Sequence, residues 1–155
     1  MRHSQKPAAI GIHASSLAGD AIAGVREVYA ALAARPIERN CIRRTECCQF
    51  RLTGETPWLT DAEALVAVKA FRATGRTRLP EPTDGSCPML ESGSGRCLIY
   101  ADRPFACRTH FCEAAGGPYA RRDVVDLIRR LEAISTPLGA GGPRPIAAAL
   151  RSQMR

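Results

Sequence analysis

The sequence predicts a mainly α protein with a small β-hairpin, folded as a single small domain around an irregular cysteine-rich centre. Three observations carry this prediction. The chain has 155 residues, of which 45% are hydrophobic, enough for one core and too few for two comfortable domains. Three stretches place apolar residues at helical spacing. All seven cysteines lie in the less regular part of the chain, between Cys41 and Cys112.

The composition divides the chain into three parts. We expect a flexible N-terminus at residues 1–15, a cysteine-cluster domain at residues 16–137, and a Gly/Pro linker with a C-terminal tail at residues 138–155. Within that tail, residues 146–155 have the pattern of a loose amphipathic helix. The central part contains every cysteine, so a candidate metal-binding site belongs there.

The predicted helices cover, in order, residues 17–35, residues 60–74 and residues 120–134. The second has the clearest limits, because Thr60 and Glu63 form a capping box at its start and Gly75 follows its end. Pro36 stops the first. The apolar stripes consist of Ile22, Val25, Tyr29 and Leu32; Ala64, Leu65, Val68 and Phe71; and Val124, Leu127, Ile128, Leu131 and Ile134.

A short hairpin is predicted between the second and third helices. Residues 89–90 and residues 97–100 are apolar, and they flank residues 91–96, which are rich in Gly and Ser. A turn of this kind brings the two flanking segments together. The hairpin therefore places Cys87, just before its first strand, near Cys97, which begins its second.

A short helix is predicted directly after the hairpin. Asp102 has the character of a cap and Pro104 that of a proline in the first turn, which would direct Cys107 back toward the hairpin. If the turn stays helical, His110 shares a face with Cys107 and Cys112 points away. If it is a loop, Cys112 is the better placed of the two.

Charge and hydropathy exclude several classes of partner. The formal net charge is +7, with 20 Arg and only 2 Lys, but the cations are scattered and aromatic residues make up 5%, which argues against a nucleic-acid interface. No run approaches the roughly 20 apolar residues that a membrane-spanning helix needs. The first residues are too polar for an export signal. We therefore expect a cytoplasmic bacterial protein that binds neither nucleic acid nor membrane.

The cysteines are the candidate metal ligands. Seven is an odd number, and the cytoplasm keeps thiols reduced, so a disulfide scaffold is disfavoured. Thiolates are soft ligands that favour iron, iron–sulfur clusters or zinc. The candidate ligands are Cys41, Cys47, Cys48, Cys87, Cys97, Cys107 and Cys112.

Arginines accompany the cysteines in sequence, at Arg43, Arg44, Arg96, Arg103 and Arg108. A site of several thiolates carries net negative charge, so these guanidinium groups are placed to donate hydrogen bonds to sulfur. The alternative is that they are simply solvated, in a chain that is rich in Arg throughout. The sequence leaves both interpretations open.

Three blocks of the sequence resemble a known family. They are Cys41 with Cys47-Cys48-Gln49-Phe50, then Cys87-Pro88-Met89-Leu90, then Cys97-Leu98-Ile99-Tyr100-Ala101-Asp102-Arg103-Pro104-Phe105-Ala106-Cys107-Arg108. In this order they resemble the YkgJ-type cysteine-cluster family, with its CxxCxxCC opening and its later CPxL and CxIYxxRPxxCR blocks. The resemblance implies a zinc- or iron-chelating, or iron–sulfur-cluster, protein. A related module resembles the cysteine cluster of flagellin lysine N-methylase.

The resemblance also implies that Tyr100, Arg103 and Arg108 lie around the metal ligands. The alternative is that Tyr100 packs in the core and Arg103 caps the turn.

One position departs from the family's pattern. Arg44 stands where the opening motif has its second cysteine, so that ligand is lost. His110 or Cys112 is available to replace it, although an exposed loop position explains His110 equally well. Seven thiols cannot fill two separate four-thiolate sites without a bridging sulfur or another ligand. One [4Fe–4S] cluster with spare cysteines fits the count, and so does a zinc pair completed by His110.

The predicted function is metal binding. The first hypothesis is a [4Fe–4S] cluster or an iron site used in redox chemistry, sensing or iron handling. The second is a structural zinc site in an interaction module. An enzyme or methylase-associated role is the third, and the sequence disfavours it, because it shows no nucleophile–base pair, no phosphate-binding glycine loop and no Cys-x-x-Cys redox motif. No catalytic residue is predicted.

Overall fold

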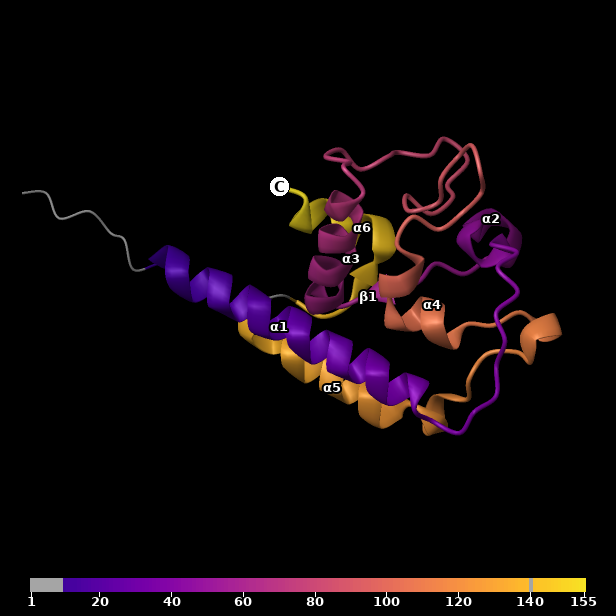
Figure 1. The fold of residues 1–155 in the computed structure, drawn as a ribbon, viewed down its shortest axis with the longest axis horizontal. Helices are drawn as coiled ribbons and strands as arrows, with labels where there is room; N and C mark the ends of the chain where they lie inside the picture. Colours follow the sequence, from indigo (N-terminus) through magenta and orange to yellow (C-terminus); the bar gives the residue numbers. More distant parts are fainter. Residues whose placement is uncertain (1–9, 140) are drawn as a thin grey trace, which may run out of the picture.

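The computed structural model describes residues 10–139 and 141–155, which are mainly helical (Figure 1). The predicted mainly α single small domain is confirmed. The helices are α1 (Ile10–Ala33), α2 (Phe50–Thr53), α3 (Asp61–Ala73), α4 (Phe105–Thr109), α5 (Val125–Ser135) and α6 (Ile146–Gln153). The strands are β1 (Trp58–Leu59) and β2 (Arg144–Pro145), and several short 3-10 turns lie between these elements.

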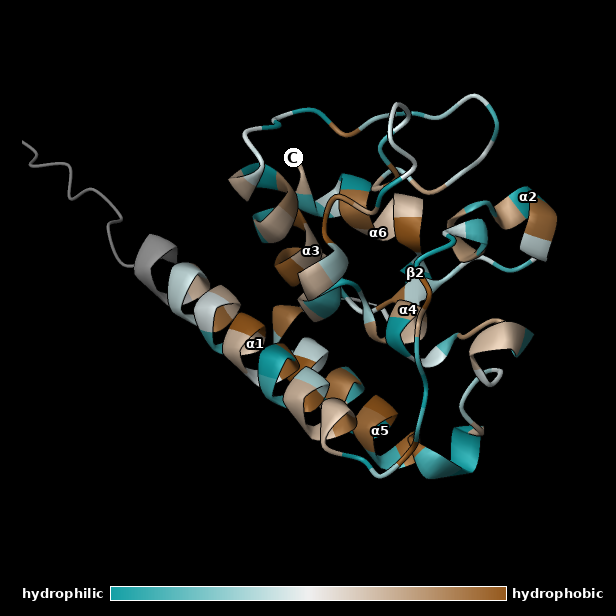
Figure 2. Cartoon of the chain, turned by 45° about the vertical axis from the view of Figure 1, so that its right-hand side comes forward, coloured by the Kyte–Doolittle hydropathy of each residue, from teal (hydrophilic) through white to brown (hydrophobic). Residues whose placement is uncertain are grey.

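One part of the hydrophobic core lies where α1, α3 and α5 meet. α1 and α5 run side by side, and α3 packs against both (Figure 1). Val25, Leu127 and Leu131, which belong to the predicted apolar stripes, are buried there. Figure 2 shows hydrophobic residues on these helices and mostly hydrophilic residues along the loop between α3 and α4. Burying each aliphatic side chain contributes roughly 1.5–3 kcal/mol, so this packing is the main support of the fold.

A second part of the core lies on the other side of α3. Phe71 of α3 packs there with Ile146 and Leu150 of α6, and all three side chains are fully or almost fully buried. Val66 of α3 belongs instead to the first part. α3 therefore joins the two parts of the core. The helix expected at residues 146–155 is α6, and it packs directly on α3.

The two strands form a small antiparallel sheet that closes the second part of the core. Trp58 pairs with Pro145 and Leu59 with Arg144. Sequence reasoning missed this pairing, because two-residue strands far apart in the chain have no alternating pattern to detect. The backbone N–H of Ile146 donates to the carbonyl of Pro57, at 2.9 Å, which fixes the start of α6 beside β1.

The predicted hairpin is present in a minimal form. Leu90 and Cys97 make a single antiparallel bridge. The N–H of Leu98 donates to the carbonyl of Met89, and the N–H of Glu91 to that of Arg96, each at 2.8 Å. The turn therefore brings Cys97 beside the residues that follow Cys87, as the sequence predicts.

Two local predictions concern the starts of helices. The capping box of α3 is confirmed, since Thr60 Oγ1 accepts from the N–H of Glu63 and Glu63 Oε2 accepts from the N–H of Thr60. The short helix α4 also forms, but the predicted cap is wrong. Asp102 lies in a 3-10 turn, and Pro104 occupies the capping position, where it has no side-chain acceptor to offer.

α1 extends further toward the N-terminus than predicted, from Ile10 rather than Leu17. Residues 1–9, which belong to the expected flexible N-terminus, lie outside the described residues. α1 has 24 residues, yet neither it nor another helix in the described ranges is long and apolar enough to cross a membrane.

The packing of α6 on α3 predicts a stability effect at Leu150, whose side chain is completely buried. Leu150→Ala should lower the free energy of unfolding by about 2–5 kcal/mol, because it leaves a cavity in the core. Arg151→Ala, at an exposed position of the same helix, should change it by less than about 0.5 kcal/mol. Urea unfolding followed by circular dichroism measures both, and equal losses in the two variants would contradict the described packing.

Candidate metal centre

Six of the seven cysteines line one cavity of about 210 Å³. These are Cys41, Cys47, Cys48, Cys87, Cys97 and Cys107, and His110 lines the same cavity. Cys112 is exposed and does not line it. The structure thus brings together most of the predicted ligands from three separate blocks of the sequence.

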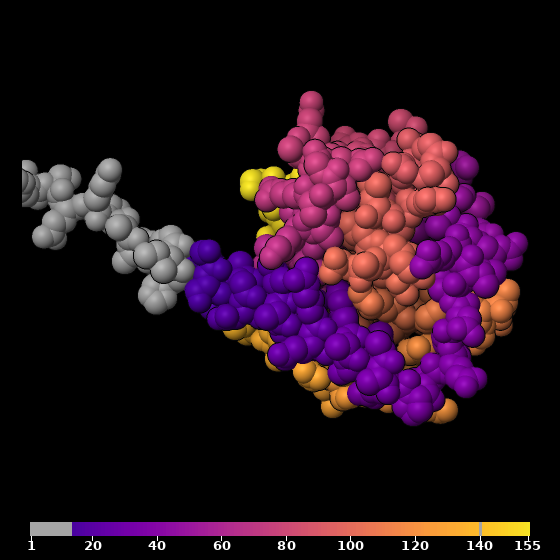
Figure 3. All heavy atoms as spheres, in the orientation of Figure 1, coloured from indigo at the N-terminus to yellow at the C-terminus, as the bar shows by residue number. Residues whose placement is uncertain are grey.

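Each block of the sequence reaches the cavity on a different element. Cys47 and Cys48 lie in the 3-10 turn Glu46–Cys48, Cys97 lies in the minimal hairpin, and Cys107 lies in α4. The N–H of Cys87 donates to the carbonyl of Cys48 at 2.8 Å, which ties the first block to the second. On the face seen in Figure 3, the segment around residues 41–57 borders the segment around residues 97–110.

The segment at residues 41–58 is weakly packed. None of its residues is buried, and α2 within it is a single turn. Arg43 and Thr45 have positive φ angles, 56° and 63°, a conformation that costs free energy for residues other than glycine. A segment with few buried contacts and strained backbone has low local stability, so it can move more easily than the helical core.

The thiols become more buried from Cys47 to Cys87 and Cys107. Cys87 is only 5% exposed, and burial raises the pKa of its thiol to about 12. Burial likewise raises the pKa of Cys107, and ionisation of Cys87 or Cys97 would raise it further. The three thiols line the same cavity, so the charge on one opposes ionisation of the others.

Cys47 differs from the other thiols. The Cys48 thiol donates a hydrogen bond to Cys47, which lowers the pKa of Cys47 to about 6 although burial opposes the change. The same hydrogen bond raises the pKa of Cys48, because Cys48 keeps the proton. The lowered pKa favours the thiolate form of Cys47, which is the form that binds metals.

Two arginines stack on Tyr100 at the cavity. The guanidinium carbons of Arg43 and Arg103 lie 4.4 and 4.1 Å from the centre of its ring. All three residues line the cavity, and within the described ranges neither guanidinium forms an ion pair with a carboxylate. Burial raises the pKa of Cys97, and the charge of Arg103 opposes that rise. These two cations can therefore offset the negative charge of thiolates.

The other arginines near cysteines have different contacts. Arg44 forms an ion pair with Glu46, at 3.2 Å. Arg108 stacks on Tyr29 and donates to the carbonyls of Arg103 and Ala101. Neither of them lines the cavity, and neither does Arg96.

His110 and Cys112 were the two candidates for the ligand missing at Arg44. The structure places His110 on the cavity wall, where its positive charge would lower the pKa of Cys47. Its Nδ1 lies 3.5 Å from Oε2 of Glu55, which also lines the cavity. Glu55 was not singled out from the sequence, because nothing in its local pattern marks it. Trp58, the only tryptophan in the sequence, also lines the cavity and was not singled out either. Its side chain is 58% exposed, which is unusual for so large an apolar residue.

The donor set fits zinc or iron by its chemistry, because thiols and an imidazole are the ligands those metals prefer. Within the described residues, however, no three Cys, His, Asp or Glu side chains are grouped closely enough to hold one metal ion. The thiols surround the cavity at a wider spacing. Coordination therefore requires the thiols to approach one another, through rotation of their side chains or movement of residues 41–58, the weakly packed part of the wall.

The pKa values and burial predict how fast the thiols react in the metal-free protein. At pH 7, iodoacetamide should modify Cys47 fastest, because its pKa is lowered and its side chain is exposed, and Cys87 and Cys107 slowest. The rate at Cys47 should fall below about pH 6. Peptide mass spectrometry measures these rates, with fragment spectra to separate Cys47 from Cys48 and urea-unfolded protein as the control. Equal rates at Cys47 and Cys87 in the folded protein would contradict the described environments.

Comparison with known proteins places this cysteine pattern in a family. A search of curated proteins gave no significant match, and neither did a search of solved structures. The model of one protein family, described as "CxxCxxCC: Putative zinc- or iron-chelating domain", matches residues 40–125. The match covers more than half of the chain and includes every cysteine. The chain therefore belongs to the CxxCxxCC family of zinc- or iron-chelating domains.

Proposed function

We propose that this protein binds an iron–sulfur cluster or iron through the thiolates of its cysteine cavity and uses it in redox chemistry, sensing or iron handling. The observation that supports the proposal is the convergence of six cysteines on one cavity. The cytoplasm is the proposed location, because a reducing compartment keeps such thiols available. The proposal assigns the chain no catalytic residue, and its binding partner is the metal or cluster itself. The scattered cations argue against nucleic acid.

The proposed ligands form an inner and an outer group. The inner group consists of the thiols that raise or lower one another's pKa, namely Cys47, Cys48, Cys87, Cys97 and Cys107. The outer group consists of the two other proposed ligands that line the cavity, Cys41 and His110. Four thiolates suffice for one [4Fe–4S] cluster. The inner group supplies them with one to spare. We do not assign Cys112 to the site, although the sequence predicted it as a ligand.

One feature favours iron over zinc. The cavity wall combines apolar side chains such as Met89 and Ile99 with the cations Arg43 and Arg103. A low-dielectric wall and nearby positive charge are the means by which proteins tune the reduction potential of thiolate-bound iron.

A structural zinc site is the second candidate, and one observation favours it. Residues 41–58 contribute no buried side chain to the core. A metal that links this segment to Cys87, Cys97 and Cys107 would hold it in place, as structural zinc does in small domains. Under this proposal the protein is an interaction module whose fold is stabilised by a structural zinc ion.

Elemental analysis and an absorption spectrum of protein purified without oxygen distinguish the two candidates. Iron with acid-labile sulfide and a broad band at about 400 nm, where thiolate-ligated clusters absorb, supports the cluster. Colourless protein with stoichiometric zinc supports the structural site. Protein that binds neither metal after reconstitution under reducing conditions would refute both.

Replacement of inner ligands should remove metal and stability together. Cys47→Ser, Cys97→Ser and Cys107→Ser should each lower the bound metal and the Tm, because metal binding is coupled to folding. Cys112→Ser, at an exposed position outside the cavity, is the matched control and should keep both. Metal content by mass spectrometry and Tm by differential scanning fluorimetry are the measurements. Full metal content in all three inner variants contradicts the proposed ligand set.

A further inference from the structure

We propose that Glu63 is a positioning residue for the metal centre: by accepting a hydrogen bond at the start of α4, it directs Cys107 toward the cavity. This inference rests on the proposed function. Glu63 does not line the cysteine cavity, and its part in the capping box of α3 does not explain all of its contacts.

The two oxygens of Glu63 serve different parts of the fold. Oε2 accepts from the backbone N–H and the hydroxyl of Thr60, both at 3.0 Å, which completes the cap of α3. Oε1 accepts from the backbone N–H of Phe105 at 2.9 Å and from the hydroxyl of Tyr29 at 3.4 Å. The capping box needs only the first oxygen. The second links α3 to α4 and α1, over 42 and 34 positions in the sequence.

Glu63 is buried, with 3% of its surface exposed. Burial raises the pKa of its carboxyl, while the donated hydrogen bonds oppose that rise. A buried acidic side chain is retained in a small protein only when its partners satisfy it. Four donors converge on the carboxylate of Glu63, so both of its oxygens are held in place.

α4 depends on this contact. It has only five residues, and the residue that caps it, Pro104, offers no side-chain hydrogen bond. The first N–H groups of a helix need acceptors from outside the helix. Glu63 Oε1 supplies the acceptor for Phe105, two residues before Cys107.

A second contact holds the other end of α4. The guanidinium carbon of Arg108 lies 4.1 Å from the centre of the Tyr29 ring, and the Tyr29 hydroxyl donates to Glu63. Phe105 and Arg108 are thereby held through the same buried group, and Cys107 lies between them. Fixing both ends fixes the rotation of this short helix, and with it the direction of the Cys107 side chain.

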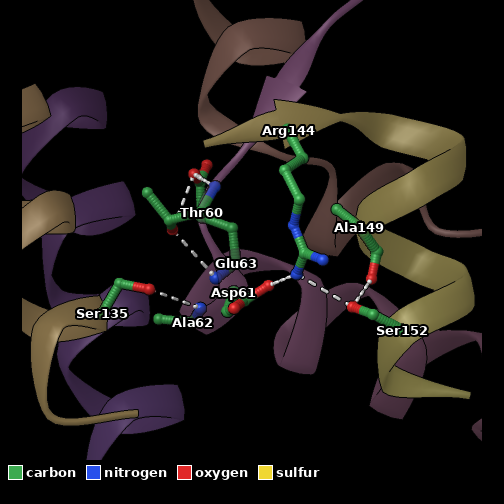
Figure 4. A network of polar contacts seen from close by, with 8 residues as sticks. All are labelled: Thr60, Asp61, Ala62, Glu63, Ser135, Arg144, Ala149 and Ser152. Atoms are coloured by element: carbon green, nitrogen blue, oxygen red, sulfur yellow. Dashed lines mark hydrogen bonds and ion pairs between the residues drawn. The ribbon is translucent and has the colours of Figure 1, made fainter. Parts of the chain in front are cut away.

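The neighbouring acidic residue provides a matched control. Asp61 is 5% exposed, begins α3, and forms an ion pair with Arg144 of β2 (Figure 4). Nη2 of Arg144 also donates to Ser152 Oγ at 3.0 Å, on α6. Asp61 therefore holds the C-terminal strand and helix, whereas Glu63 holds α4. The two carboxylates are similarly buried, and only one leads to a cysteine.

The test compares E63Q with D61N in the full-length chain. In E63Q an NH₂ donor replaces one of the two acceptor oxygens, so the side chain can no longer accept from both Thr60 and Phe105, and the link from the start of α3 to α4 is weakened. We expect the affinity for Zn²⁺, measured in competition with a chromophoric chelator, to fall about 10- to 100-fold, as it does when a residue that orients a ligand is lost. D61N should keep the wild-type affinity. Urea unfolding of both metal-free variants shows whether they lose similar stability.

Two results would overturn the inference. One is wild-type Zn²⁺ affinity in E63Q. The other is an equal loss of affinity in D61N and E63Q at equal loss of stability, since Glu63 would then act only through general stability. If E63Q does not fold, Tyr29→Phe serves instead. It removes one donor to Oε1, and with it the link between Glu63 and the ring on which Arg108 stacks. It should lower the affinity several-fold, and an unchanged affinity in Y29F would contradict the inference.

A second readout separates this inference from the proposed function. In the metal-free protein, E63Q should raise the rate at which iodoacetamide modifies Cys107 at least several-fold relative to Cys87, while D61N leaves that ratio unchanged. An unchanged ratio in E63Q contradicts the positioning role. If the wild-type chain binds no metal, the proposed function fails, and this ratio still decides whether Glu63 positions Cys107.

Discussion

At the buried start of α3, polar groups meet partners from four distant segments of the chain. α3 is also the shared element of both parts of the core, because its residues pack against α1 and α5 on one side and α6 on the other. Buried polar groups must all be satisfied, and here the satisfying partners come from distant segments: Tyr29, Phe105, Ser135 and Arg144. The polar contacts that complete one helix terminus thereby determine where α4 and the C-terminal strand lie. The cysteine cavity is built on that arrangement.

The molecule combines a well-packed half with a weakly packed one. Helices α1, α3, α5 and α6 bury their apolar stripes, while no side chain of residues 41–58 is fully buried, and Cys48 and Phe50 pack only partly buried against the core. The cysteines of the better-packed half, Cys87 and Cys107, are the more buried, and their pKa values are raised. Cys47 lies on the weakly packed side, and its pKa is lowered. This division suits metal binding, because a thiol that ionises easily on a movable segment can bind the ion first and then approach the thiols held by the core.

Sequence reasoning predicted what local patterns encode. The capping box at Thr60 and Glu63 was predictable from four residues, and the apolar stripes from helical periodicity. The contacts of Glu63 Oε1 were not predictable, because its partners lie 34 and 42 positions away in the sequence and leave no local pattern. The pairing of β1 with β2 was missed for the same reason. In the site, the family's blocks identified the cysteines, but only the fold distinguishes His110, on the cavity wall, from Cys112, outside it.

X-ray absorption at the metal edge shows whether the cysteines from the three blocks bind one metal centre together. We expect a first coordination shell dominated by sulfur, at about 2.3 Å for either zinc or iron thiolates. Cys107→Ser should lose sulfur from that shell. A first shell of oxygen and nitrogen alone, at about 2.0–2.1 Å, would contradict the claim, since the metal would then lie away from the cysteine cavity.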